Sequence, residues 1–519
     1  MGVPRSLRTA VLGGLAAALT LTSCAAEPLE RAADDGTGPV PSATADGTAP
    51  STASTAGLEE YYEQQLTWDS CGDFECSEAT VPLSYDEPDG ESITLALKRL
   101  PSSAPDARVG SLLVNPGGPG TPGIELVDAA ATMFSEDLRA AYDVVGFDPR
   151  GVGSSTPVDC VSDAELDRLR SVEYDTESQA GVAAYAADAK LIADGCAENT
   201  GELIGHVDTE SAARDMDILR AVLGEEKLDY LGYSYGTFLG ATYADLFPQH
   251  TGNLVLDGAM DPSLSSHETT LTQAVGFEEA LRAYVEDCQG GPDCPLTGSV
   301  DDGVRQVQTL LDVAADTPLP TSSDRELTAS LAFSGIITPL YDSASWFVLT
   351  SALDQAINAN DGSQLLFLAD LMAGREDDGT YPDNSTEANW AVNCLDFPSS
   401  GDPALWQQQA AELETAAPTF GPLMGFGDML CADWPGKDDA ERGPLTAEGS
   451  APIMVVGTTG DPATPYEWSV SLADQLENGF LVTYEGEGHT AYGRSNDCVV
   501  RAVDDFLIDG VVPEDGLTC

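Results

Sequence analysis

The chain has 519 residues, of which 87 are Asp or Glu and 22 are Lys or Arg, so its formal net charge is −65. Such a charge repels nucleic acid and anionic lipid, which argues against nucleic acid as a partner. It would attract cationic groups such as peptide amino termini, although it equally suits a solvated surface in a salty exterior. The chain is longer than one hydrophobic core normally requires, which favours a large domain with an insertion.

Residues 1–24 have the pattern of a bacterial export signal. Two arginines precede an apolar stretch over residues 10–21, which is too short to span a bilayer as a mature helix. Residues 21–24 (Leu-Thr-Ser-Cys) resemble a lipobox, which predicts a mature chain that begins at Cys24 and carries a lipid there. The alternative is an ordinary signal peptide cleaved nearby. We expect an exported, cell-surface lipoprotein anchored to the membrane only at Cys24, with partial release left open.

The next segment, residues 25–57, consists mainly of Ala, Thr, Gly, Ser, Pro and Asp. It contains too little apolar surface to offset the entropy lost on ordering, so it is predicted to be a disordered tether. Such a tether would hold the folded part of the chain away from the cell envelope.

The number of cysteines is consistent with export. Removing Cys24 from the eleven leaves ten, an even number that suits a disulfide framework in an oxidising compartment. Ten cysteines allow on the order of 900 connectivities, so any assignment from spacing is a guess. No Cys-x-x-Cys or His-x-x-x-His pattern occurs, and we expect no metal site. Spacing along the chain suggests Cys71 with Cys76, Cys160 with Cys196, Cys288 with Cys294, Cys394 with Cys431, and Cys498 with Cys519.

Hydrophobic periodicity predicts a mostly parallel sheet. An alternating pattern or a short continuous apolar run, both typical of strands, occurs in seven places. A helix is predicted over residues 211–223, where the apolar residues share one face. The predicted strands cover residues 92–100, 109–114, 142–147, 228–231, 253–256, 452–456 and 480–484.

A glycine-rich stretch, residues 115–120 (Asn-Pro-Gly-Gly-Pro-Gly), follows the second strand. Backbone N–H groups reach a developing alkoxide only where the chain comes close, which favours glycine, so Gly118 is a candidate oxyanion-hole donor. A competing interpretation is a dinucleotide-binding fingerprint, because Gly118, Gly120 and Gly123 fit G-x-G-x-x-G. Two prolines in the stretch remove N–H groups that would hold a pyrophosphate, so we expect no cofactor.

Residues 232–236 (Gly-Tyr-Ser-Tyr-Gly) lie between the 228–231 strand and a helical pattern over residues 237–247. This is the setting of a nucleophile elbow, in which a sharp turn exposes the serine hydroxyl and the flanking glycines avoid steric clashes. Ser234 is therefore the candidate nucleophile, and the N–H of Tyr235 is the second candidate oxyanion donor.

Two later loops supply a candidate acid and base. Asp461 lies in Gly-Thr-Thr-Gly-Asp-Pro after the 452–456 strand, and His489 lies in Gly-Glu-Gly-His-Thr after the 480–484 strand. The order serine, aspartate, histidine, each after a strand, is that of α/β-hydrolases. Of the four histidines, His489 alone follows the acid on a glycine-flanked loop. Asp257, after the 253–256 strand, is the alternative acid.

The alternation of strands and helices is lost in residues 260–449, where long helical patterns indicate a helical cap inserted into the core. The predicted organisation is a signal peptide over residues 1–24, a tether over 25–57, an α/β-hydrolase core over 58–259 and 450–519, and a cap over 260–449.

From about Tyr61 to Cys519 the chain resembles the proline iminopeptidase-related α/β-hydrolases, and most closely the exported tripeptidyl aminopeptidases of actinobacteria. Residues 390–396 look like part of the extra cysteine-rich region of that subfamily. Pro116 stands where the wider family usually has histidine, which argues against strict proline specificity. The segments that carry the resemblance are residues 115–120, 146–155, 232–236 with 244–248, 457–462 and 486–490.

The resemblance implies acyl transfer onto a serine. Ser234 would attack the scissile carbonyl, His489 would move the proton to the leaving amine, and Asp461 would fix the imidazole tautomer. The N–H groups of Gly118 and Tyr235 would stabilise the oxyanion. The expected partners are peptides or proteins with free N-termini, and the expected activity is release of tripeptides.

Three further residues have less specific interpretations. Arg150 is expected to brace the 146–155 loop. Asp396 is one candidate for an acidic group that binds the substrate's amine, in a chain where acidic residues are common. Asn384 begins an Asn-Ser-Thr glycosylation pattern that we interpret as a plain surface loop.

Two other functions stay open at this point. An esterase could use the same three residues on acyl esters. A noncatalytic lipoprotein could use the fold only to bind a ligand.

Overall fold

The computed structural model describes residues 57–397, 399–436, 442–514 and 516–519. The predicted signal peptide, Cys24 and residues 25–56 of the predicted tether lie outside these residues. In the ranges that are described, no helix is long and apolar enough to cross a membrane.

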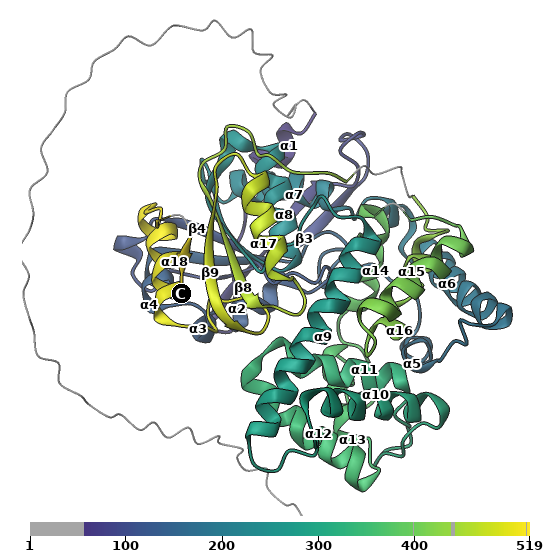
Figure 1. Ribbon diagram of the computed structural model, residues 1–519. Coiled ribbons are helices and arrows are strands. Elements are labelled where there is room, and N and C mark those ends of the chain that lie inside the picture. The colour runs from purple at the N-terminus through teal and green to yellow at the C-terminus, as the bar shows by residue number, and fades with distance from the viewer. Residues whose placement is uncertain (1–56, 398, 437–441, 515) are drawn as a thin grey trace, which may run out of the picture. The chain divides into compact units, whose positions relative to one another are not determined.

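A ten-stranded sheet forms the centre of the fold, in the order β1-β2-β3-β5-β4-β6-β7-β8-β9-β10 (Figure 1). The pairs from β1 to β5 are antiparallel, and all pairs from β5 to β10 are parallel. This is an α/β-hydrolase fold, as predicted. The strands are β1 (Asp69–Cys71), β2 (Phe74–Pro82), β3 (Ser92–Leu100), β4 (Gly110–Asn115), β5 (Tyr142–Phe147), β6 (Leu228–Tyr233), β7 (Thr251–Asp257), β8 (Ile453–Gly460), β9 (Gly479–Glu487) and β10 (Leu517–Thr518).

All seven predicted strands are present, five of them as interior parallel strands. Every residue of β4 and β5 is buried, which explains why these strands appear in the sequence as continuous apolar runs. The sequence analysis missed β1, β2 and β10. Two of these are very short, and β2 carries exposed or half-exposed residues over its first half, so none has the apolar pattern of a buried strand.

Helices cover both faces of the sheet, and successive strand residues belong to different cores. Leu112 and Val114 of β4 pack in one cluster with α2, α4 and α18, whereas Leu113 packs in another with α7, α8 and α17. The helices of this layer are α1 (Glu59–Glu63), α2 (Gly123–Asp128), α3 (Ala130–Met133), α4 (Glu136–Ala141), α7 (Thr209–Val222), α8 (Tyr235–Leu246), α17 (Tyr466–Gln475) and α18 (Asp497–Asp509), with the short turns η1 (Pro105–Ala107), η2 (Gly201–Gly205) and η3 (Pro248–His250).

Between β7 and β8 the described chain is helical, as the predicted cap requires. Helices α9 to α13 and α16 bury a hydrophobic cluster of their own, which is centred on residues such as Leu281, Leu311 and Leu353. The elements are α9 (Ser266–Gly290), α10 (Val300–Asp316), α11 (Ala329–Ile337), η4 (Thr338–Tyr341), η5 (Ser343–Ser345), α12 (Trp346–Ala359), α13 (Ser363–Met372), α14 (Ser385–Asp396), α15 (Pro403–Ala416), α16 (Gly421–Met424) and η6 (Gly427–Cys431).

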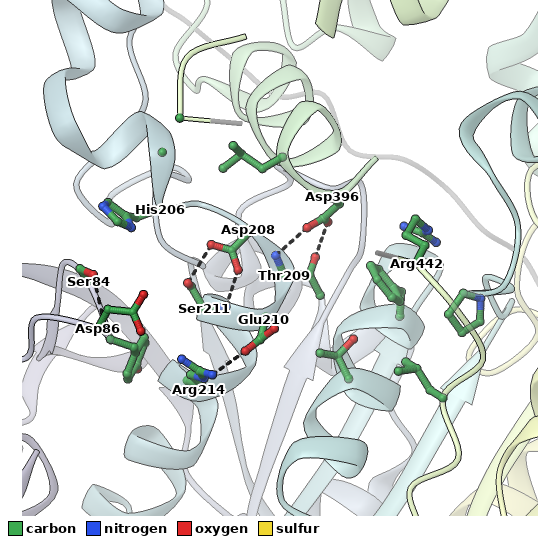
Figure 2. A pocket seen from close by; sticks show the side chains of 18 of the residues that line it. Ser84, Asp86, His206, Asp208, Thr209, Glu210, Ser211, Arg214, Asp396 and Arg442 are labelled. Carbon is green, nitrogen blue, oxygen red and sulfur yellow. Dashed lines mark hydrogen bonds and ion pairs between the residues drawn. The ribbon is translucent and has the colours of Figure 1, made fainter. Parts of the chain in front are cut away.

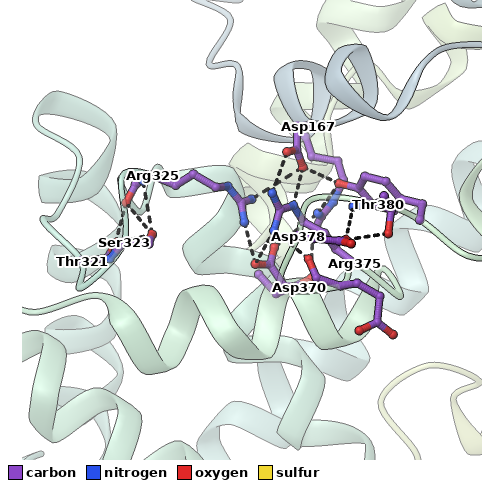
Figure 3. Close-up of polar contacts among 12 residues, drawn as sticks. Asp167, Thr321, Ser323, Arg325, Asp370, Arg375, Asp378 and Thr380 are labelled. Carbon is purple, nitrogen blue, oxygen red and sulfur yellow. Dashed lines mark hydrogen bonds and ion pairs between the residues drawn. The ribbon is translucent and has the colours of Figure 1, made fainter. Parts of the chain in front are cut away.

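Helices α5 (Asp163–Ser171) and α6 (Gln179–Thr200) precede the elbow in sequence but contact the cap, and the sequence analysis did not anticipate this. Figure 3 shows ion pairs between α5 and the cap, and one within the cap. Asp167 of α5 accepts from Nε and Nη2 of Arg375, and within the cap Asp370 of α13 accepts from Arg325 at 2.6 Å. Arg170 of α5 also donates to the Ala369 carbonyl. The cap is therefore fastened by charged groups as well as by apolar packing.

The five disulfides are those that spacing suggested. They join Cys71 to Cys76, Cys160 to Cys196, Cys288 to Cys294, Cys394 to Cys431, and Cys498 to Cys519. Each links cysteines no more than 37 residues apart, so each one closes a local loop.

Asn384 lies in the loop before α14, as expected, but its half-buried side chain makes specific contacts. Its side-chain amide donates to the carbonyls of Gly151 and Val158, both at 2.8 Å, and its oxygen accepts from Gly153 N–H at 2.8 Å. Asn384 therefore ties the start of α14 to the loop after β5, and its amide nitrogen is already engaged in this contact.

Arg150 braces that same loop from inside. Its guanidinium donates two 2.7 Å hydrogen bonds to Asp215, and both side chains are fully buried. It also donates to the carbonyls of Pro82, Leu83 and His206. Because a buried charge needs such partners, Arg150 fixes the loop after β5 against α7 and the end of β2.

We predict that Arg150→Met lowers the free energy of unfolding by about 3–5 kcal/mol, because it leaves the Asp215 carboxylate buried without a cation. The matched control is Arg168→Met, since Arg168 also pairs with two carboxylates but its side chain is 41% exposed. That control should lose about 1 kcal/mol or less. Urea denaturation followed by tryptophan fluorescence measures both, and equal losses would contradict the prediction.

Candidate active site

Ser234 occupies a strained turn between β6 and α8. Its φ is 54°, in the left-handed region that non-glycine residues rarely adopt, and its side chain is half-buried. A Cβ at Gly232 would collide with the carbonyl of Gly236, and one at Gly236 would lie 2.8 Å from Oδ1 of Asn115. The two flanking glycines are therefore required by the packing, as a nucleophile elbow predicts.

Asp461 and His489 lie together although 28 residues separate them. Nδ1 of His489 is 2.9 Å from each oxygen of Asp461. Asp461 follows β8 and His489 follows β9, which are adjacent parallel strands, so both loops leave the same edge of the sheet. The carboxylate holds Nδ1 and leaves Nε2 as the ring nitrogen that can accept a proton from a hydroxyl.

The acid loop is fixed by hydrogen bonds within itself and to the histidine loop. Asp461 accepts from the N–H groups of Ala463, Thr464 and Thr490, at 2.9, 2.8 and 3.1 Å. The Thr464 hydroxyl donates to Asp461 at 3.0 Å and lies 3.3 Å from Nδ1 of His489. The sequence analysis missed Thr464, and no motif it considered would have found it, since a threonine three residues after an aspartate is a common spacing.

Asp257, the alternative acid, does not contact the imidazole. Its side chain accepts from the N–H groups of Ala491 and Tyr492 instead. Asp461 is therefore the carboxylate that holds His489 in this structure.

The glycine-rich loop after β4 runs directly against the elbow. A Cβ at Gly117 would lie 2.5 Å from the Tyr233 carbonyl and 3.1 Å from the Tyr235 nitrogen. Gly117, the residue before Gly118, therefore packs against the elbow. Tyr235 is the first residue of α8, where an N–H has no partner within the helix. The two candidate oxyanion donors thus come from two adjacent loops, and their roles stay a prediction.

Two glycines of the competing dinucleotide fingerprint, Gly120 and Gly123, pack closely against neighbouring elements. A Cβ at Gly120 would lie 2.5 Å from the Ser385 carbonyl of α14, and one at Gly123 would collide with the Phe147 carbonyl of β5. Asn389 of α14 also donates to the Pro119 carbonyl at 3.1 Å. Close packing against α14 and β5 therefore accounts for these glycines without a bound nucleotide.

The cap contacts both loops of the acid–base pair. The N–H of His489 donates to the Tyr341 carbonyl at 2.8 Å, and the Tyr341 ring lies edge-on to the imidazole with centroids 5.4 Å apart. Gln273 of α9 donates to the Ala463 carbonyl at 2.8 Å. The position of the imidazole thus depends on the cap as well as on the sheet.

Asp396, the candidate amine-binding residue, is held by Thr209 at the border of a cavity (Figure 2). Its carboxylate accepts from the N–H and the hydroxyl of Thr209, at 2.9 and 2.6 Å, and burial raises its pKa to about 7. The Thr209 hydroxyl is also 2.5 Å from the Tyr235 phenol. Asp396 borders a cavity of about 460 Å³ that Arg442 and Phe238 also line. Among the residues that the structure describes, neither Ser234 nor His489 lines this cavity. The position of Asp396 therefore does not support binding of a substrate amine beside the Ser234 turn.

These groups form a set that can carry out acyl transfer. The set contains a serine hydroxyl on a sharp, half-buried turn, an imidazole whose Nδ1 is held by a carboxylate, and a glycine-rich loop that packs against the turn.

Comparison with known proteins agrees with this chemistry. Residues 417–519 match the family model described as TAP-like protein. The chain is 38% identical to the serine protease Hip1 of Mycobacterium tuberculosis, over 86% of this chain and 87% of that protein. It is also 38% identical to carboxylesterase B of the same species, over 88% and 90%, and 31% identical to the tripeptidyl aminopeptidase of Streptomyces coelicolor, over 90% and 86%.

Solved structures are more distant in sequence. The crystal structure of a proline iminopeptidase from Mycobacterium smegmatis is 15% identical, with 83% of this chain and 98% of that chain covered and a TM-score of 0.34. An α/β-hydrolase fold protein from Chitinophaga pinensis is 12% identical, with 86% and 98% covered and a TM-score of 0.31. On the identity and coverage of its sequence relatives, the chain belongs to the TAP-like family of α/β-hydrolases and is a serine hydrolase.

Proposed function

We propose that this protein is an exported aminopeptidase that releases tripeptides from the free N-termini of peptides. Ser234 is the nucleophile, His489 the general base and acid, and Asp461 the carboxylate that supports the imidazolium. The observation that carries the proposal is the contact of Nδ1 of His489 with both oxygens of Asp461, on loops that leave the same sheet edge as the Ser234 turn.

In the proposed reaction the hydroxyl of Ser234 turns toward Nε2 of His489 and attacks the scissile carbonyl. The proton taken by Nε2 passes to the leaving amine, and water then hydrolyses the acyl-enzyme by the same route. The N–H groups of Gly118 and Tyr235 stabilise the oxyanion, each contributing on the order of 3 kcal/mol to the transition state.

Two observations favour an amine-recognising peptidase. One relative that the chain matches over most of its length is a tripeptidyl aminopeptidase. The net charge of −65 also favours the approach of a cationic N-terminus over that of an anionic ester. The carboxylesterase relative, which is 38% identical, makes ester hydrolysis the second candidate function.

The proposed location is the cell surface. Residues 10–24 carry the apolar stretch and the Leu-Thr-Ser-Cys pattern of a lipoprotein signal, and the five disulfides of the described residues suit an oxidising compartment.

We predict that Ser234→Ala abolishes labelling by a fluorophosphonate probe and lowers kcat on the order of 10⁴-fold or more, because no other nucleophile replaces the hydroxyl. Ser154→Ala, which changes an exposed serine in the loop after β5, is the control and should label and hydrolyse normally. Undiminished labelling of Ser234→Ala would contradict the assignment, and a parent protein that does not label would favour the noncatalytic alternative.

We predict that acetylation of the N-terminus slows hydrolysis of a tripeptide anilide at least about 100-fold, since the blocked amine loses a charge-assisted contact worth about 3 kcal/mol. The comparison is made on kcat/KM for one tripeptide in its free and acetylated forms, with a short acyl ester as a third substrate. Equal rates for the two peptides, together with faster ester cleavage, would favour the esterase function.

We predict that Cys24→Ala moves the protein from the membrane fraction to the medium when the full-length chain is expressed in an actinobacterial host, because one thioether-linked lipid group is lost. The readout is an immunoblot of both fractions together with metabolic palmitate labelling. Undiminished palmitate labelling of Cys24→Ala would contradict lipidation at this residue.

A further inference from the structure

Asp257 links the nucleophile turn to the histidine loop. It is the last residue of β7 and is completely buried. Its carbonyl accepts the N–H of Ser234 at 2.9 Å. Its carboxylate accepts the N–H of Tyr492 at 2.7 Å and that of Ala491 at 3.0 and 3.1 Å. One residue thus contacts the elbow through its main chain and the segment after His489 through its side chain.

Within the described residues the Asp257 carboxylate has no Lys or Arg partner in an ion pair or hydrogen bond. Its only hydrogen-bond donors are the two backbone N–H groups, although a buried carboxylate normally requires a cation or several donors. The histidine loop carries two groups that can be cationic, His489 and Arg494, and Arg494 donates to the His489 carbonyl at 3.3 Å. Nearby titratable and charged groups are His489 and Asp461 on the catalytic loops, Tyr233 of β6, and Tyr492 and Arg494 after the histidine.

The charge of Asp257 is sensitive to its surroundings. Burial is the main cause that raises its pKa to about 7, and the N–H groups of Tyr492 and Ala491 and the charge of His489 act in the opposite direction. The two N–H groups and the charge of His489 therefore offset part of the cost of burying the Asp257 carboxylate.

We propose that Asp257 is a second carboxylate of the site: a positioning residue that holds the histidine loop against the Ser234 turn. Asp461 holds Nδ1 directly, whereas Asp257 acts through the backbone of residues 491 and 492 and through its charge. The proposal rests on the proposed hydrolytic function of Ser234 and His489.

The proposal has a consequence for the pH dependence. Because the pKa of Asp257 is raised to about 7, its carboxylate gains a proton as the pH falls below neutrality, and the protonated form holds the two N–H groups less well. Activity on the acid side should fall as Asp257 is protonated. Removal of the Asp257 charge should therefore move the acid limb of the kcat/KM profile to lower pH. A purely structural role would lower the rate and leave that limb in place.

The test compares Asp257→Asn, which keeps the size but removes the charge, with Asp229→Asn as a matched control. Asp229 of β6 is a carboxylate that also accepts a backbone N–H, that of Asn253 at 2.8 Å, and burial raises its pKa too, but it contacts neither catalytic loop. Asp257→Asn should lower kcat about 100-fold with little change in KM. It should also shift the acid limb about one unit downward. Asp229→Asn should do neither.

A second readout keeps the test independent of the substrate. The rate at which a fluorophosphonate labels Ser234, measured from pH 5 to 9, reports the same imidazole whether the protein is a peptidase or an esterase. If Asp257→Asn does not fold, Asp257→Ser supplies an uncharged acceptor at the same place. An unmoved acid limb in a folded variant, or equal effects in Asp229→Asn, would overturn the proposal. A parent that does not label at all would instead show that the proposed function fails.

Discussion

The hydrogen-bonded contact between Asp461 and Nδ1 of His489 depends on a constraint of the sheet. Strands β6, β7, β8 and β9 are parallel neighbours, so the loops that follow them leave the same edge. Ser234, Asp461 and His489 lie just after three of these strands, and Asp257 ends the fourth. Antiparallel pairing at any of these positions would send one of the groups to the opposite edge, so their meeting in this protein depends on the parallel pairing.

The cap does more than cover that edge. The Tyr341 carbonyl accepts the N–H of His489, and Gln273 binds the carbonyl of Ala463, so the acid–base pair is fixed from both sides. The cap is in turn fastened to α5 by the ion pairs of Asp167 with Arg375 and of Arg170 with Asp370. A disturbance in the cap can therefore reach the imidazole through hydrogen bonds, without any change in the sheet.

Buried carboxylates recur where this protein fixes a loop. Asp215 holds Arg150, Asp461 holds His489, and Asp257 holds the backbone after His489. In each case N–H donors or one cation stabilise the carboxylate, because a buried charge needs such partners. The large acidic excess of the chain therefore includes a few carboxylates with structural and chemical roles that net charge alone does not reveal.

The sequence by itself determined the class of fold, the interior strands and the three candidate residues Ser234, Asp461 and His489, because burial periodicity and glycine-flanked turns are local patterns. It also suggested the disulfide pairs, whose cysteines lie close along the chain. Only the tertiary structure decided that Asp461 rather than Asp257 holds the imidazole and that Thr464 joins the pair. It also placed the cap on the histidine loop and tied the half-buried Asn384 to the loop after β5. Such contacts join segments as far as 233 residues apart, and their geometry follows from packing that no local pattern encodes.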